Sequence, residues 1–161
     1  MNKRYHIGTS FIILIAVLAL DQITKYIVAT TMQLRDSYNV IPGFLNITSH
    51  RNPGAAWGIL SGHMSLFFII TIVVIAVLIS FYIKEAKHNL FMQISISLLM
   101  AGAIGNFIDR LRLGEVIDFI DTYIFGYDFP IFNVADASLT VGVIFILIAL
   151  LRDNKRQSQE G

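Results

Sequence analysis

The chain has 161 residues, which is enough for one domain. Hydrophobic residues make up 55% and charged residues 14%, a composition too apolar for an ordinary soluble domain. The absence of cysteine excludes disulfides, thiolate zinc sites and cysteine nucleophiles, and none of the four histidines forms an H-E-x-x-H pair. We therefore expect neither a metal nor another cofactor.

The first apolar segment follows a short basic start with Lys3 and Arg4. It is similar to a secretory signal peptide, but no small-residue cleavage site closes it and more long apolar runs follow. We predict a retained transmembrane helix over about 7–28, near the roughly 20 residues that a bilayer requires. Asp21 and Lys25 are four residues apart near its outer end, so they share a helix face and are expected to form a structural ion pair.

Residues 30–64 are mixed and polar, with turn signals at Pro42-Gly43 and at Asn52-Pro53-Gly54. β-Branched apolar pieces within 40–48 are compatible with strands. The amphipathic stretch 55–60 is expected at the membrane interface, where aromatic side chains such as Trp57 are enriched. Asn52 is either a turn former or a residue that contacts substrate.

Three further transmembrane helices are predicted over about 65–83, 90–108 and 134–151. Gly102 and Gly105 allow the third to pack closely against its neighbours. We expect the polar residues at its end, Asn106, Asp109 and Arg110, to bond across helices.

The remaining two segments are polar. Residues 111–132 form an acidic, aromatic loop, and the tail 152–161 is expected to fray. The whole chain is thus predicted to be one integral membrane domain, all-α apart from a small β-containing region.

The distribution of charge predicts the orientation. Short loops rich in Lys and Arg remain cytoplasmic. One side of a four-span bundle would collect the basic residues of both termini and of the 84–89 turn, whereas the other side holds more acids. Both termini are therefore predicted to be cytoplasmic, and regions 30–64 and 111–132 to be extracytoplasmic.

Two acids stand where the chain is otherwise apolar. Asp118 lies between Ile117 and Phe119, and Asp136 begins the last apolar segment. Asp136 fits a first-turn acid that complements the helix dipole, with Asn133 as the cap. Carboxylates at the edge of the hydrocarbon are costly, however, and by default indicate function. Apolar neighbours would raise the pKa of Asp118.

Other assignments remain open at this point. Asp121 or Asp128 could be the functional acid in place of Asp118, although they fit a loop or cap acid and a turn residue. No serine lies in a G-x-S-x-G elbow, so a carboxylate pair that activates water is the better-supported chemistry. A small proton- or ion-coupled transporter is the alternative function, and it predicts acids near the bilayer middle. A non-enzymatic assembly factor leaves the acid pair unexplained.

Five motifs in order resemble those of bacterial lipoprotein signal peptidase (signal peptidase II), particularly its staphylococcal-type members. They are D-Q-I-T-K at 21–25, N-P-G-A-A-W at 52–57, G-N-F-I-D-R at 105–110, V-I-D-F at 116–119 and F-N-V-A-D at 132–136. Each motif alone is weak, but five in order across nearly the whole chain are specific.

The resemblance implies an aspartyl endopeptidase of the bacterial cytoplasmic membrane, with its active site on the extracytoplasmic side. It would remove the signal peptide from prolipoproteins, cutting before a cysteine that carries diacylglycerol, and would be blocked by globomycin. We expect a monomer with no nucleic-acid partner.

The resemblance also assigns residues. The catalytic pair falls on Asp118 and Asp136. The positions matching residues that support the site or contact substrate and inhibitor are Asp21, Lys25, Asn52, Gly54, Asn106, Asp109, Arg110, Asn133 and Ala135. The Trp57 segment and the aromatic loop with Phe125, Tyr127, Phe129 and Phe132 are expected to clamp the substrate.

Overall fold

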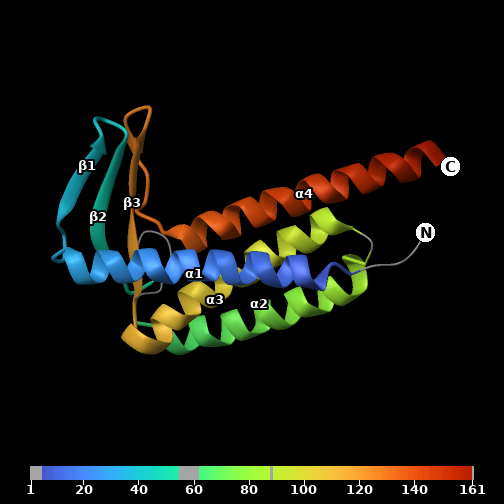
Figure 1. Cartoon of the computed structure of the whole chain (residues 1–161), viewed down its shortest axis with the longest axis horizontal. Coiled ribbons are helices and arrows are strands. Elements are labelled where there is room, and N and C mark those ends of the chain that lie inside the picture. The colour runs from blue at the N-terminus through green and yellow to red at the C-terminus, as the bar shows by residue number, and fades with distance from the viewer. Residues whose placement is uncertain (1–4, 55–61, 88, 161) are drawn as a thin grey trace.

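The computed structural model describes residues 5–54, 62–87 and 89–160. Four long helices run side by side, and a small sheet lies at one end of the bundle (Figure 1). The helices are α1 (Ile7–Thr31), α2 (Met64–Glu85), α3 (Leu90–Leu113) and α4 (Val134–Glu160). All four are long and apolar enough to cross a membrane.

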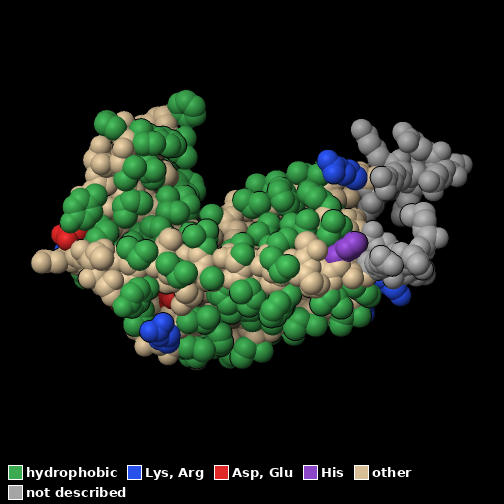
Figure 2. All heavy atoms as spheres, viewed as in Figure 1, with side chains coloured by type: hydrophobic (Ala, Val, Ile, Leu, Met, Phe, Trp, Pro, Cys, Tyr) green, Lys and Arg blue, Asp and Glu red, His purple; other side chains and the backbone are tan. Residues whose placement is uncertain are grey.

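Helix α3 is the centre of the bundle. Of its most apolar stretch, 56% is buried inside the protein, against 6% to 22% for the other three helices. Those helices therefore turn most of their apolar surface outward, as membrane helices do towards lipid. Figure 2 shows hydrophobic side chains along the length of the bundle, with the visible charged side chains near its ends.

Two glycines of α3 allow the close packing that the sequence predicts. A Cβ atom added at Gly102 would lie 2.5 Å from the Ala135 carbonyl oxygen. One added at Gly105 would lie 2.6 Å from Asp21 Oδ2. Both distances are too short for a methyl group, so the absence of a side chain lets α3 approach α1 and α4 closely.

The helices are longer than predicted, because polar residues near their ends form hydrogen bonds within the helix and so do not terminate it. Helix α3 continues past residue 108 to Leu113, and Gly114, with a φ of 74° and an N–H bond to the Arg110 carbonyl, forms a left-handed cap. In α1, the Thr30 and Thr31 hydroxyls donate to carbonyls of the preceding turn. The polar tail was expected to fray, but α4 runs on through it to Glu160.

The sheet has strand order β1-β2-β3-β4 and is antiparallel throughout. The strands are β1 (Ser37–Ile41), β2 (Leu45–Asn52), β3 (Val116–Ile124) and β4 (Tyr127–Asp128). Strands within 40–48 were predicted and are confirmed. The description of 111–132 as a loop was wrong, since β3 is the strand that joins the sheet to the site. Its buried residues lie on both faces, so it lacks the alternation of a half-exposed strand.

The sheet and bundle share a small core. Val28 of α1 packs with Ile117 and Phe119 of β3, and Val134 packs against this cluster. Because β3 follows α3 after only two residues, this contact fixes β3 beside the ends of α1 and α4. The stretch 55–60 with Trp57, expected at the interface, lies outside the described residues.

Candidate functional site

Asp118 is held on β3 by two side-chain amides. Asn52 Nδ2 donates to its Oδ2 at 3.0 Å, and Asn133 Nδ2 donates to its Oδ1 at 2.7 Å. The residue is only 1% exposed. Burial, followed by the negative charge of Asp136, raises the pKa of Asp118 to about 7 although both amides lower it. The expected direction of this pKa shift is confirmed.

Asp136 lies in the first turn of α4, where Asn133 caps the helix as predicted. The Asp136 N–H donates to Asn133 Oδ1 at 2.9 Å, and the Asn133 N–H donates back to Asp136 Oδ2 at 3.2 Å. This reciprocal pair has the geometry of a capping box. Because one carboxylate oxygen of Asp136 accepts a hydrogen bond in the cap, the cap fixes the orientation of the Asp136 side chain.

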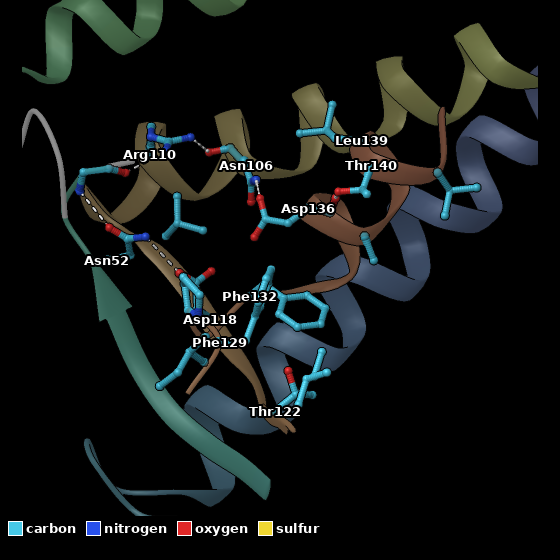
Figure 3. Close-up of a pocket in the computed structure, with 17 residues that line it drawn as sticks. Asn52, Asn106, Arg110, Asp118, Thr122, Phe129, Phe132, Asp136, Leu139 and Thr140 are labelled. Carbon is cyan, nitrogen blue, oxygen red and sulfur yellow. Dashed lines mark hydrogen bonds between the residues drawn. The ribbon is translucent and has the colours of Figure 1, made fainter. Parts of the chain in front are cut away.

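Two asparagines join the acids into one network. Asn106 Nδ2 donates to Asp136 Oδ1 at 2.7 Å, and Asn133 Nδ2 donates to Asn106 Oδ1 at 3.1 Å as well as to Asp118. Both carboxylates line a single pocket of about 640 Å³ between β3, α3, α4 and the segment 129–132. We call Asp118 and Asp136 the dyad, and this pocket the dyad pocket. Figure 3 shows Asp118 and Asp136 on opposite sides of this pocket, with Asn106 next to Asp136.

A buried ion cluster supports this network from behind. Lys25 Nζ lies 2.9 Å from Asp21 Oδ2 and 3.0 Å from Asp109 Oδ2, and it donates to Asn106 Oδ1 at 2.9 Å. Lys25 and Asp21 are at most 1% exposed, so the predicted ion pair exists, with Asp109 as a second partner. A buried charge is tolerated when it is paired and hydrogen-bonded in this way.

Asp21 and Asp109 also accept hydrogen bonds from backbone N–H groups of other elements. Asp21 Oδ1 accepts from the Ala135 N–H at 2.8 Å, which joins α1 to the start of α4. Asp109 Oδ2 accepts from the Ile117 N–H at 3.2 Å, which joins α3 to the residue before Asp118. Both carboxylates therefore position the chain next to Asp118 and Asp136.

The other side of Asp118 is held by the end of β2. Asn52 Oδ1 accepts from the Gly54 N–H at 3.0 Å, which orients the amide that donates to Asp118. The Gly54 carbonyl accepts from Arg110 at 3.1 Å, and the Arg110 guanidinium lies 4.5 Å from the Phe67 ring centre. Asn52 thus acts as a turn former and a pocket residue at once, so its two interpretations do not exclude each other.

The residues assigned by the resemblance therefore all lie in or next to one site. Asp121 and Asp128 do not line the dyad pocket. They are not loop or turn acids either, since Asp121 is a buried residue of β3 that accepts from Thr48 at 2.6 Å, and Asp128 belongs to β4.

Several site residues were not predicted. Gln22 Nε2 lies 3.1 Å from both Asp21 Oδ2 and Asp109 Oδ1, so it bridges the two acids that pair with Lys25. Its signals in the sequence were its place next to Asp21 and inside the D-Q-I-T-K motif. Thr122, Leu139 and Thr140 line the pocket without any local motif.

The aromatic loop divides into two parts. Phe129 and Phe132 line the pocket, whereas Phe125 and Tyr127 are exposed on the β3–β4 hairpin. Among the described residues, no group of three or more His, Asp or Glu side chains is placed to hold a metal ion.

Chemically, two carboxyl groups that face one pocket, with the pKa of Asp118 raised to about 7, can work as an acid and a base on a water molecule. Within the described helices, Asp21, Lys25, Asp109 and Asp136 gather at one end of the bundle. A transporter path with acids near the bilayer middle is not seen in these segments.

Comparison of the chain with known proteins agrees with this chemistry. The family model for "Signal peptidase (SPase) II" matches residues 13–152. A lipoprotein signal peptidase of Staphylococcus haemolyticus is 71% identical over 153 residues, covering 95% of this chain and 97% of that protein. One of Staphylococcus aureus strain JH9 is 65% identical over 160 residues, covering 99% and 98%. A solved bacterial membrane enzyme superposes with a TM-score of 0.93 at 67% identity, covering 97% and 95%.

Proposed function

The chain belongs to the signal peptidase II family of membrane aspartyl peptidases, and from this premise we propose that Asp118 and Asp136 are its two catalytic carboxylates. One observation carries the assignment. The two acids line one pocket and share a continuous set of amide donors through Asn106 and Asn133. Neither Asp121 nor Asp128 has that arrangement.

Asp118 is the better candidate for the protonated partner. Two carboxylates that face one pocket do not both ionise readily, and burial together with the charge of Asp136 raises the pKa of Asp118 to about 7. Both acids accept two N–H bonds, but Asp136 also lies in the first turn of α4, where the helix dipole favours a carboxylate. In the resting state Asp136 is then the base and Asp118 the acid.

The reaction follows from these roles. Asp136 removes a proton from water, the oxygen bonds to the scissile carbonyl carbon, and Asp118 gives its proton to the carbonyl oxygen. Asp136 then passes its proton to the leaving nitrogen as the C–N bond breaks, and Asp118 recovers a proton from the tetrahedral hydroxyl. The products are a carboxylic acid and an amine, and the pair returns to its starting protonation.

The substrate is a membrane-held prolipoprotein that carries diacylglycerol on the cysteine after the cleaved bond. Apolar residues of β3, α4 and the 129–132 segment line the dyad pocket beside the two acids, including Ile124, Ile131, Leu139 and Val141. Such a lining suits acyl chains next to a peptide bond. Globomycin would occupy the same pocket, with Asn52 and Arg110 among its contacts.

The active site faces the extracytoplasmic side, and both termini are cytoplasmic. The described chain begins, and α4 ends, at the end of the bundle opposite the sheet (Figure 1). Lys84 in the last turn of α2 and Lys87 in the α2–α3 turn lie at that end, which fits the cytoplasmic preference of basic residues. We propose that the enzyme works as a monomer, because one chain by itself brings both acids and their amide donors together around one pocket.

The test is cleavage of a diacylglyceryl-modified precursor by the purified protein in detergent, with the unmodified precursor alongside. We expect cleavage before the modified cysteine only, and inhibition by globomycin. Equal cleavage of the unmodified precursor would refute the substrate assignment, and absence of cleavage would refute the activity.

A further inference from the structure

The β3–β4 hairpin carries a bulky aromatic residue at its tip, in a backbone conformation that does not suit it. Phe125 has a φ of 51° and Gly126, which follows it in the turn, has a φ of 81°. Tight turns of this kind favour Asn, Asp or Gly at the first position, because a large side chain is strained at positive φ. The Phe125 side chain is fully exposed, so no contact within the protein compensates for this strain. A bulky ring at this position therefore points to a partner outside the chain.

The two faces of the hairpin differ in charge. Tyr127 is paired with Ile124 and Asp128 is paired with Tyr123, and successive residues of a strand point to opposite faces. Ile124 and Tyr127 therefore share the face on which Asp118 meets the dyad pocket, and Ile124 lines that pocket. Asp128 lies on the opposite face. The hairpin is thus amphipathic, with its apolar face on the side of the pocket.

The apolar face of the hairpin is turned towards the membrane-spanning helices. The dyad pocket lies between β3 and the helices α3 and α4, so the pocket face of β3 looks towards the bundle. Strand β1 is the edge of the sheet farthest from the helices, whereas β3 lies beside the start of α4 and projects sideways from the bundle (Figure 1). Figure 2 shows an open notch between the projecting sheet and the helices, with hydrophobic side chains along both walls. In a membrane the space beside α4 is filled by lipid.

The dyad pocket is continuous with this lipid-facing surface. Ile124 and Phe129 on the side of the hairpin, and Val141 on α4, line the pocket. These three residues are also 40% to 42% exposed. The pocket therefore opens sideways, between the hairpin and α4, onto the surface that α4 presents to lipid.

We propose that the tip and apolar face of the β3–β4 hairpin bind the surface of the lipid bilayer next to α4, and that Phe125 inserts into it as an anchor. The partner is the glycerol and upper acyl region of the phospholipids, where aromatic side chains are enriched. An amphipathic segment lies in that region with its apolar face buried and its charged face in water, which places Asp128 on the water side. The inference rests on the chain spanning a membrane and not on the catalytic roles of the dyad.

The experiment measures the depth of the hairpin in a bilayer. The chain has no cysteine, so a single-cysteine variant carries a nitroxide label at one chosen position. Full-length Tyr127→Cys and Tyr38→Cys are labelled in nanodiscs of phosphatidylcholine and phosphatidylglycerol; Tyr38 is an equally exposed aromatic residue on β1, the far edge of the sheet. Oxygen concentrates in lipid and a nickel chelate stays in water, so the ratio of their collision rates with the label reports depth. We expect this ratio to be several-fold higher at position 127 than at position 38.

A second comparison tests the anchor itself. In the protein labelled at position 127, Phe125→Asp should lower the ratio towards that at position 38, because a charge is costly at the edge of the hydrocarbon. Phe125→Trp keeps an interfacial aromatic ring and should leave the ratio unchanged. Tyr38→Asp adds the same charge on the far edge of the sheet and is the matched control, which should also have no effect.

Three results would overturn the inference. Equal ratios at positions 127 and 38 would place the hairpin in water. A label at position 127 that is shielded from both oxygen and the nickel chelate would show a protein contact in place of lipid. An unchanged ratio in Phe125→Asp would show that Phe125 is not the anchor. No readout involves cleavage, so each of these results would leave the proposed function intact.

Discussion

Removing the Asn52 amide should raise the pH at which activity is lost. The Asn52 N–H bond at 3.0 Å favours the ionised form of Asp118 and so lowers its pKa. A hydrogen bond to a charged group contributes about 1.5 to 3 kcal/mol, and one pKa unit corresponds to about 1.4 kcal/mol. Because water can replace part of this bond at the partly exposed Asn52, we expect a shift of about one pH unit in Asn52→Ala.

The assay is kcat/KM for a lipidated precursor across pH 5 to 9. In the wild type, kcat/KM should fall as pH rises through about 7, where Asp118 loses the proton that it must donate. In Asn52→Ala the fall should occur at higher pH, with lower activity at the optimum. Asn39→Ala removes a side-chain amide that bonds Asn46 at 2.9 Å, far from the dyad, and is the matched control. An unchanged or lower pH of the fall in Asn52→Ala would refute the reasoning.

Three further predictions concern stability. In the folded state the pKa of Asp118 is about 7, above its ordinary value of 3.8. The contribution of Asp118 to stability is therefore complete at low pH and is lost as pH rises through about 7. The melting temperature should consequently fall less between pH 6 and 8 in Asp118→Asn than in the wild type. Lys25→Met leaves Asp21 and Asp109 buried without their cation and should cost about 3 to 5 kcal/mol, whereas a melting temperature equal to that of the wild type would show that the cluster is not stabilising. Gly105→Ala would push a methyl group to 2.6 Å from Asp21 Oδ2 and should lower the melting temperature, while Gly8→Ala, with nothing within 4 Å, should not.

The sequence predicted the elements that a membrane imposes. Four apolar runs of membrane length and the glycines of α3 were visible without the structure, because spanning a bilayer requires them. Strand β3 was missed because its acids interrupt the apolar pattern, and those acids are tolerated only through partners distant in the chain. Asn52 is 66 residues from Asp118, and no local pattern reports such a contact.

The site was predicted unevenly for the same reason. Asp136 and its Asn133 cap follow from local helix chemistry. The choice of Asp118 over Asp121 was only modestly favoured by its apolar neighbours and was settled by the family resemblance. Gln22 and Thr140 become site residues only when α1, α3 and α4 are assembled. Tertiary contacts therefore decided which of several plausible acids faces the pocket.

The central claim is that Asp118 and Asp136 act as one catalytic unit. Its most direct test is cleavage of a diacylglyceryl-modified precursor by purified Asp118→Asn, Asp136→Asn and the double variant, with folding checked by melting temperature. An amide keeps the shape of the carboxyl group but cannot exchange a proton, so each single variant should lose about 10²- to 10⁴-fold in kcat. The double variant should lose little more than either single variant, because residues that act as a unit are strongly non-additive. Asp121→Asn should continue to cleave. Near wild-type cleavage by Asp118→Asn together with an inactive Asp121→Asn would contradict the account.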